Sequence, residues 1–166
     1  ISKRLYLIAW AIWLIDFATK SWALANLDAR NPVKVIGSFL QLTLIKNSGA
    51  AFSLAEGATV LFSIFACLVI ISIGYFAPKL TSKGWSVVMG LALGGILGNL
   101  SDRIFREPGF FSGHVIDWIE IPNWPVFNIA DSAIVVATAI AVVLSIKNIS
   151  PIEPVNVEKK DRSEEA

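Results

Sequence analysis

Two uncharged runs in the middle of this chain constrain its fold more than any other feature. The first covers the 22 residues between Glu56 and Lys79, and the second covers the 18 residues between Lys83 and Asp102. At a rise of about 1.5 Å per residue, helices of these lengths cross a hydrocarbon core of about 30 Å. We therefore predict that each run forms a transmembrane helix.

Two further apolar stretches have similar lengths but contain charged residues. The stretch from Leu5 to about Leu24 contains Asp16 and Lys20, and the stretch from about Val126 to Ile146 contains Asp131. The whole chain is 55% hydrophobic and only 16% charged, which leaves too little polar material to cover a soluble globule of 166 residues. The predicted fold is an all-α membrane protein with four transmembrane helices.

Basic residues are distributed unevenly between the two ends of these helices. Most lie on the side that holds both chain ends and the connection between the second and third helices: Lys3, Arg4, Lys79, Lys83, Lys147, Lys159, Lys160 and Arg162. Short segments rich in Lys and Arg stay in the cytoplasm, so we predict that both termini are cytoplasmic. We expect residues 1–150 to form one domain and residues 151–166, rich in Pro, Glu and Lys, to form a disordered cytoplasmic tail.

The two extracytoplasmic segments are expected to have structure of their own. In the first, at about residues 28–57, the stretch Val33–Lys46 is rich in alternating and β-branched residues, which predicts short strands with Gly37-Ser38 as a turn. The second, at about residues 105–125, mixes aromatic residues with Pro and Gly. This composition predicts an interfacial loop or helix, so the fold gains a small β-rich segment and an interfacial segment outside the bilayer.

Five short polar motifs interrupt or flank the apolar stretches. They cover Asp16–Lys20, Asn47–Phe52, Gly94–Arg103, His114–Asp117 and Phe127–Asp131. An ionisable group at membrane depth costs at least about 2.5 kcal/mol and is retained mainly where it is paired or has a function. Helical rise, counted from the charged helix ends, places Asp16, Asp102 and Asp131 in the outer half of the bilayer. With Asp117 in the adjacent external segment, the acids can converge near the extracytoplasmic surface.

Some of these residues also have simple structural explanations. Asp16 and Lys20 are four residues apart on one helical face and can neutralise each other. Asn128 can cap a helix that has Asp131 in its first turn. In the third helix, glycines at positions 90, 94 and 98 favour close packing against a neighbouring helix and need no catalytic role.

The remaining acids can be explained in the same way. Asp102 can form an ion pair with its neighbour Arg103 at the end of the third helix. Asp117 can be a solvated loop acid, and His114 is more often an orienting or exposed residue than a ligand. These separate explanations do not account for the presence of all five motifs in one chain.

In their order and content the five motifs resemble those of the lipoprotein signal peptidases, the type II signal peptidases of bacteria. The resemblance covers about residues 5–142 and implies a four-helix aspartyl protease of the cytoplasmic membrane. The family's catalytic aspartates lie in Val-x-Asp and Phe-Asn-x-Ala-Asp motifs, which match Asp117 and Asp131. Supporting or substrate-binding positions are matched by Asp16, Lys20, Asn47, Gly49, Asn99, Arg103, Asn128 and Ala130.

One departure from the family pattern is the long stretch between Arg103 and Asp117, which looks like an insertion relative to many relatives. It leaves the motif assignment intact, and Asp102 stays a supporting residue and an alternative member of the catalytic pair. The resemblance implies a prolipoprotein substrate that carries a diacylglyceryl-modified cysteine and is cut just before that cysteine. We expect a monomer that contacts membrane lipid, binds no nucleic acid and needs no cofactor.

Two carboxylates fit peptide hydrolysis on chemical grounds as well. An amide resists attack at neutral pH because resonance weakens its carbonyl carbon as an electrophile. The ionised member of an acid pair can take a proton from the attacking water, while the protonated member donates a hydrogen bond to the developing oxyanion. Close like charges and partial burial separate the two ionisations, and Asp131 at a helix start is expected to ionise more easily.

Other classes of protein fit the sequence less well. The chain has no Gly-x-Ser-x-Gly or His-Glu-x-x-His motif, and one His and one Cys do not supply the usual zinc ligands. A Ser/Lys dyad that uses Lys20 would leave Asp117 and Asp131 idle. The non-enzymatic alternative is a small proton-coupled carrier, although carriers usually show internal repeats with broken helices at the midplane.

Overall fold

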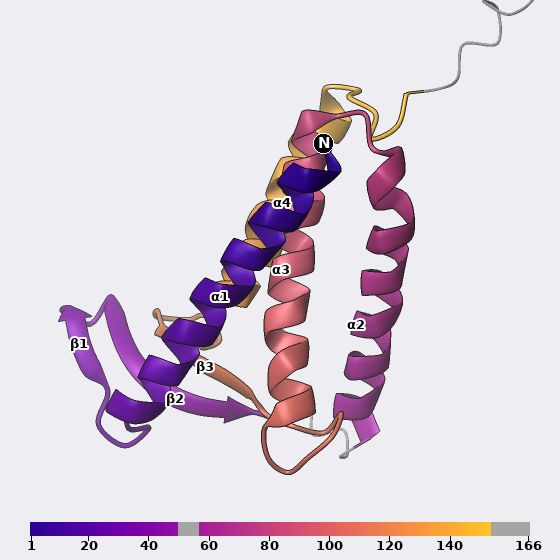
Figure 1. Ribbon diagram of the computed structural model, residues 1–166. Helices are drawn as coiled ribbons and strands as arrows, with labels where there is room; N and C mark the ends of the chain where they lie inside the picture. The colour runs from indigo at the N-terminus through magenta and orange to yellow at the C-terminus, as the bar shows by residue number, and fades with distance from the viewer. Residues whose placement is uncertain (50–56, 154–166) are drawn as a thin grey trace, which may run out of the picture.

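Four long helices dominate the computed structural model, which describes residues 1–49 and 57–153 (Figure 1). They are α1 (Ser2–Asn26), α2 (Gly57–Phe76), α3 (Lys83–Phe105) and α4 (Ile129–Ile146), with a short 3-10 helix, η1 (Ala77–Lys79), after α2. In the described part of the chain, four helical segments are long and apolar enough to cross a membrane. The four predicted transmembrane helices are therefore confirmed.

Helix α3 lies at the centre of the bundle and packs along both α1 and α4, whereas α2 makes a smaller contact with α3 (Figure 1). Glycines make the contact with α1 unusually close. A Cβ atom placed on Gly90 would lie 2.8 Å from the carbonyl oxygen of Leu5, and one on Gly94 would lie 2.7 Å from that of Ala9. Because a methyl group does not fit at these distances, the prediction of close packing through the glycine positions is confirmed.

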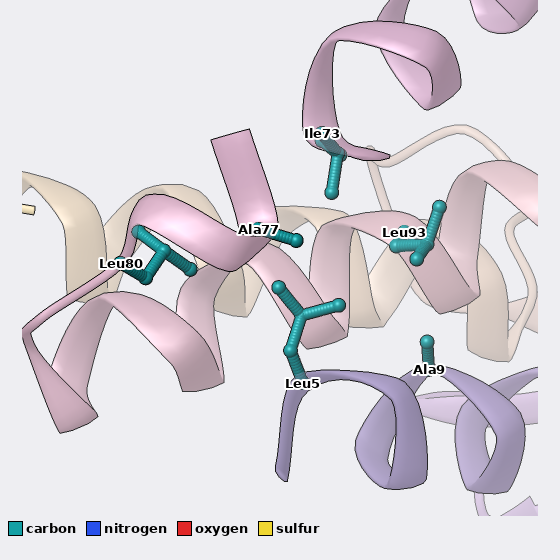
Figure 2. Close-up of a cluster of buried hydrophobic side chains, with 6 residues drawn as sticks. All are labelled: Leu5, Ala9, Ile73, Ala77, Leu80 and Leu93. Carbon is teal, nitrogen blue, oxygen red and sulfur yellow. The ribbon is translucent and has the colours of Figure 1, made fainter. Parts of the chain in front are cut away.

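An apolar cluster fills one end of the bundle, where the N-terminus and the connection between α2 and α3 lie (Figure 2). The side chains of Leu5, Ala77 and Leu93 meet there from three elements. The rest of the cluster is Ala9, Ile73 and Leu80. We call this end the apolar end and the opposite end, where α1 and α3 finish and α4 begins, the sheet end.

The sheet has three antiparallel strands in the order β1 (Val33–Ile36), β2 (Leu40–Asn47) and β3 (Val115–Glu120). The predicted turn at Gly37-Ser38 joins β1 to β2, and it is closed by the Phe39 amide, which donates to the Ile36 carbonyl at 2.9 Å. Gly37 has a φ of +53°, a left-handed conformation that glycine adopts without a steric penalty. The predicted strands in this segment are thus confirmed.

The third strand lies in the segment that was expected to form an interfacial loop or helix. Val115–Glu120 is rich in β-branched and aromatic residues, a composition that favours a strand once a partner edge is available. Strand β2 supplies that edge and pairs Ile45 with Asp117 and Asn47 with Val115. Asp117 lies opposite Ile45, and Asn47 is two residues from Ile45 on the same strand. Side chains of paired residues, and of residues two apart on a strand, point to the same face, so Asn47 and Asp117 lie on one face of the sheet.

The beginning of the predicted tail is attached to the bundle. The carbonyl of Pro151 accepts hydrogen bonds from the amides of Thr81 and Ser82, in the connection that precedes α3. Residues 154–166, which make up most of the predicted tail, lie outside the described residues.

Candidate active site

Polar side chains from five elements meet at the sheet end and form one connected network of hydrogen bonds and ion pairs. It unites Asp16 and Lys20 of α1, Asn47 of β2, Asn99, Asp102 and Arg103 of α3, Asp117 of β3, and Asn128 and Asp131 at the start of α4. The polar motifs therefore converge in space, although they are far apart in the sequence.

The carboxylate of Asp117 is held from both sides by amide groups. Its Oδ1 accepts a hydrogen bond from Nδ2 of Asn128 at 2.6 Å, and its Oδ2 accepts one from Nδ2 of Asn47 at 2.8 Å. Asp117 is only 2% exposed. The alternative of a solvated loop acid is therefore wrong, because strand β3 turns this side chain into the network.

Asp131 lies in the first turn of α4 and forms a capping box with Asn128. The Asp131 amide donates to Oδ1 of Asn128 at 2.9 Å, and the Asn128 amide donates to Oδ2 of Asp131 at 3.2 Å. The capping explanation predicted for this pair is confirmed. Asn128 also bonds Asp117, so this one residue bridges the two acids, and the capping role and the bridging role coexist.

Asn99 connects the acid pair to the buried ions of the helix bundle. Its Nδ2 donates to Oδ1 of Asp131 at 2.8 Å, and its Oδ1 accepts from Nζ of Lys20 at 2.9 Å and from Nδ2 of Asn128 at 3.2 Å. Because the carbonyl oxygen faces two donors, the amide orientation is fixed and the NH₂ group must point to Asp131.

Lys20 is completely buried and lies between two carboxylates. Its Nζ is 2.7 Å from Oδ2 of Asp16, as predicted from their spacing, and 2.8 Å from Oδ2 of Asp102. Asp102 also accepts from the backbone amide of Ile116 at 3.2 Å and forms an ion pair with Arg106. Asp102 is thus bound to cations, whereas Asp117 and Asp131 are bound to amides.

The predicted ion pair between Asp102 and Arg103 is absent from the described part of the chain, and Arg106 takes its place. Adjacent residues on a helix point about 100° apart, whereas residues four apart share a face, so Arg106 reaches Asp102 and Arg103 does not. Sequence reasoning missed Arg106, although its spacing from Asp102 was a usable signal. The two residues are joined at Nε of Arg106.

Arg103 lies beside the acids with much of its donor capacity unused. Its Nη1 donates to the backbone carbonyl of Asn99 at 3.3 Å, while its buried Nε has no hydrogen-bond partner among the described residues. A guanidinium group carries five N–H donors, so this side chain can still bind oxygen atoms of a ligand.

The start of α4 is fixed by a carboxylate from α1. Oδ1 of Asp16 accepts a hydrogen bond from the backbone amide of Ala130 at 2.9 Å, one of the amides that a helix start leaves without an intrahelical partner. Ala130 is completely buried, and a Cβ on Gly98 would lie 3.1 Å from its methyl group. Small residues at these two positions therefore let α1, α3 and α4 meet at the network.

The last predicted position, Gly49, follows strand β2. Its amide donates to Oδ1 of Asn47 at 2.8 Å, which orients the Asn47 side chain so that its NH₂ group faces Asp117. Gly49 has a φ of +79°, which favours glycine at this position. Residues 50–52 of the same motif lie outside the described residues, and His114 is half-buried with its backbone amide bonded to the carbonyl of Glu107.

The environment of Asp117 makes its carboxyl group harder to ionise than that of a free aspartate. Burial, together with the nearby charge of Asp131, raises the pKa of Asp117 to about 6, although hydrogen bonds from Asn47 and Asn128 oppose this rise. The neighbouring Asp131 has a different environment, because it lies in the first turn of α4 and accepts hydrogen bonds from the Asn99 side chain and the Asn128 backbone. Two neighbouring acids in different environments can therefore act as a proton donor and a proton acceptor.

The donor set at the site consists of carboxylates, amides and cationic side chains. Among residues 1–49 and 57–153, no group of three or more His, Cys, Asp or Glu side chains is arranged to hold a metal ion. The cations Lys20, which is buried, and Arg106, which is half-buried, already occupy the carboxylate oxygens of Asp102. The arrangement is suited to acid–base chemistry by a pair of carboxyl groups.

Comparison with known proteins gives concordant matches over most of the chain. Residues 8–147 match the family model described as signal peptidase (SPase) II. A lipoprotein signal peptidase of Streptomyces coelicolor is 43% identical over 147 residues, which are 89% of this chain and 72% of that protein. One of Streptomyces griseus subsp. griseus is 46% identical over 144 residues, which are 87% of this chain and 74% of that protein.

A solved structure has the same fold. It is described as a bacterial membrane enzyme determined by the in meso method at 1.9 Å resolution, and it superposes with a TM-score of 0.77 at 28% sequence identity. The match covers 86% of this chain and 92% of that chain.

Proposed function

This chain belongs to the signal peptidase II family, and we propose that it removes the signal peptides of prolipoproteins as an aspartic endopeptidase in a bacterial membrane. The proposed catalytic pair is Asp117 and Asp131. The observation that carries this assignment is the bridge that Asn128 makes by bonding both acids. Among the described residues, neither of these acids forms an ion pair with a cationic side chain.

The first proposed step is general base catalysis by Asp131. Its ionised carboxylate takes a proton from a water molecule while the water oxygen attacks the carbonyl carbon of the scissile peptide bond. Protonated Asp117 donates a hydrogen bond to the carbonyl oxygen, on which negative charge develops. A neutral tetrahedral intermediate forms when this proton is transferred to that oxygen.

The second step reverses the proton positions. Asp131, now protonated, gives its proton to the leaving amide nitrogen, and the C–N bond breaks. Asp117 takes back the proton of the hydroxyl group as the carbonyl reforms. The products are a free carboxyl end on the signal peptide and a free amine on the mature chain, and both acids return to their initial states.

The neighbouring residues are proposed to position these acids and the substrate. Asn99 and Asn128 fix the carboxyl groups of Asp131 and Asp117 through the bonds described above. Arg103 has unused donors beside the pair, and we assign it to a backbone carbonyl or lipid-ester oxygen of the substrate. Asp16, Lys20 and Asp102 tie α1 to α3 and α4 and do not take part in the chemistry.

We propose a diacylglyceryl-modified prolipoprotein as the substrate, cut just before its lipidated cysteine. The site lies where the apolar helices end and the sheet begins, which is the depth at which a lipid-anchored cysteine meets water (Figure 1). In this proposal one domain, residues 1–150, acts as a monomer with both termini in the cytoplasm and the site at the extracytoplasmic surface. Labelling of Ser2→Cys and Arg30→Cys from either side of a vesicle, in a Cys67→Ala background, tests the orientation.

The experiment that tests the function compares two precursors and three variants. Purified protein should shorten a diacylglyceryl-modified precursor and leave its unmodified counterpart intact. Asp117→Asn and Asp131→Asn should each abolish cleavage, whereas Asp28→Asn, at a side chain that is 46% exposed, should not. Full cleavage by both site variants would refute the assignment.

Two further measurements separate the alternatives. Chelators should leave cleavage unchanged, and a loss of activity that zinc restores would indicate a metal enzyme instead. A proton-coupled carrier would conduct protons into liposomes in the absence of any proteolysis, a result that would overturn the peptidase assignment.

A further inference from the structure

The hairpin formed by β1 and β2 exposes apolar side chains that nothing in the described chain covers. Every residue of β1 is exposed, including Val33 at 50% and Val35 at 52%. The two residues that flank the turn are more exposed still, with Ile36 at 59% and Phe39 at 64%. Strand β1 is also an edge of the sheet, so one row of its backbone groups is unpaired within the sheet.

The position of this hairpin explains its composition. Figure 1 shows the hairpin projecting sideways from the sheet end and turning back along the helix direction, so that its turn is level with the second half of α1. The second half of α1 exposes Phe17 (52%) and Trp22 (45%). The turn of the hairpin therefore lies at the level of exposed apolar side chains on a helix long and apolar enough to cross a membrane.

We propose that the β1–β2 hairpin inserts its turn into the outer leaflet of the bilayer and holds the sheet at a fixed depth. The occupant of its apolar surface is the acyl-chain and headgroup region of membrane lipid. An exposed cluster of this kind on a membrane protein fits lipid better than water, because aromatic and branched side chains gain from burial in the interface.

The backbone of the hairpin limits how deeply it can enter. Unpaired N–H and C=O groups are costly in hydrocarbon, so the free edge of β1 should stay in the hydrated interface. The turn is different, because the Phe39 amide is already bonded to the Ile36 carbonyl. The side chains that flank the turn are therefore the deepest part of the hairpin.

The charges around the hairpin agree with this depth. Lys34 is exposed in the middle of β1, and the amine on its long side chain can reach lipid phosphates while the strand lies in the interface. Strand β2 continues directly into Asn47, which bonds Asp117 on β3. Anchoring the turn in lipid would consequently fix the depth of the site residues on the sheet, an inference that stands whether or not the proposed reaction is correct.

Spin labels in lipid vesicles test the proposal directly. In a Cys67→Ala background, a nitroxide on Phe39→Cys reports the turn, and one on Glu107→Cys, an exposed loop position after α3, serves as the aqueous control. A lipid-facing control is Phe65→Cys on α2, where the native side chain is 64% exposed. Collision with a water-soluble nickel complex should be several-fold lower at position 39 than at position 107, and collision with oxygen should be higher.

Two results would overturn the proposal. One is equal access of the nickel complex to positions 39 and 107, which would place the turn in water. The other is strong spin–spin broadening at position 39 at low protein density, which would show that a second copy of the chain pairs with the β1 edge. A variant with Ile36→Ser and Phe39→Ser, labelled at Ser38→Cys, should show several-fold greater nickel access than the same label on the unsubstituted hairpin.

Discussion

Helices α1 and α3 contact each other through apolar side chains at one end and through charged and amide side chains at the other. At the apolar end, α1 and α3 meet through the apolar side chains of Leu5, Ala9 and Leu93 (Figure 2). At the sheet end, the same helices meet through Lys20, Asp102 and the groups bonded to them. Between the two ends the glycines of α3 keep the helices equally close.

The two ends therefore respond to substitution in different ways. In a bilayer, apolar contacts between helices gain from close packing and little from exclusion of water, so size and shape decide which residues fit. Buried ions are costly unless every partner is present, so at the sheet end the charge and hydrogen-bonding groups of each side chain decide which residues are tolerated. We therefore expect substitutions at the apolar end to change stability and substitutions of the proposed acid pair to change turnover.

The sharpest contrast is expected between Asp131→Asn and Leu5→Ala. Removing the proposed base should lower kcat for a lipidated precursor by at least about 10⁴-fold, with little change in melting temperature. Leu5→Ala should lower the melting temperature and leave kcat per folded molecule unchanged. Gel-based cleavage assays give kcat, and thermal unfolding in the same detergent gives the melting temperature. If the two variants changed kcat and the melting temperature in the same way, this expectation would be wrong.

Lys20→Met should have the largest effect on stability. It leaves Asp16 and Asp102 buried without their shared ammonium group, and the loss of one partner in a buried ionic cluster costs about 3–5 kcal/mol. Thermal or chemical unfolding measures this cost. The matched control is Lys46→Met on β2, where the lysine is exposed, and equal stability of the two variants would show that the buried ions do not depend on each other.

Gly94→Ala tests the close contact that both ends share. The added methyl group would lie 2.7 Å from the carbonyl oxygen of Ala9, so α1 and α3 must separate, at a cost of about 1–3 kcal/mol. Gly74→Ala on α2 is the control, because a Cβ there meets nothing within 4 Å and helix propensity favours alanine. A drop in melting temperature for Gly74→Ala as large as that for Gly94→Ala would argue against the packing explanation.

The smallest expected effect is a shift in pH dependence. If the proton on Asp117 is required, kcat/KM should fall as pH rises through the pKa of about 6 of this acid, because the deprotonated form cannot donate to the oxyanion. The bond from Asn47 lowers this pKa, so Asn47→Leu should move the alkaline limb to higher pH. Gln41→Leu on the same strand should not move it, and a shift to lower pH in Asn47→Leu would contradict the assigned proton position.

Local spacing explains which contacts could be predicted from the sequence. The pairs Asp16–Lys20 and Asn128–Asp131 follow from positions four and three residues apart at known places in a helix, and both are confirmed. The contact between Lys20 and Asp102 depends on how α1 and α3 are rotated against each other. The sequence spacing within one helix does not determine the rotation between two helices, so this ion pair could be identified only from the structure.

Strand β3 shows a different limit. The β-branched and aromatic content of Val115–Glu120 was visible in the sequence, but aromatic and proline residues around it favoured an interfacial segment. The strand forms because β2, from a distant part of the chain, offers a free edge in the correct register. Its formation is what turns Asp117 toward Asn128 and away from solvent.

The hydrogen bond that the Ala130 amide donates to Asp16 joins α1 to α4. Helix α4 brings both the bridging amide of Asn128 and the carboxylate of Asp131, and it leaves the ribosome after everything else in the network. In the proposed reaction, a nascent chain that lacks this helix lacks the proposed base and cannot hydrolyse the precursor. The order of synthesis would therefore delay hydrolysis until α4 has been made.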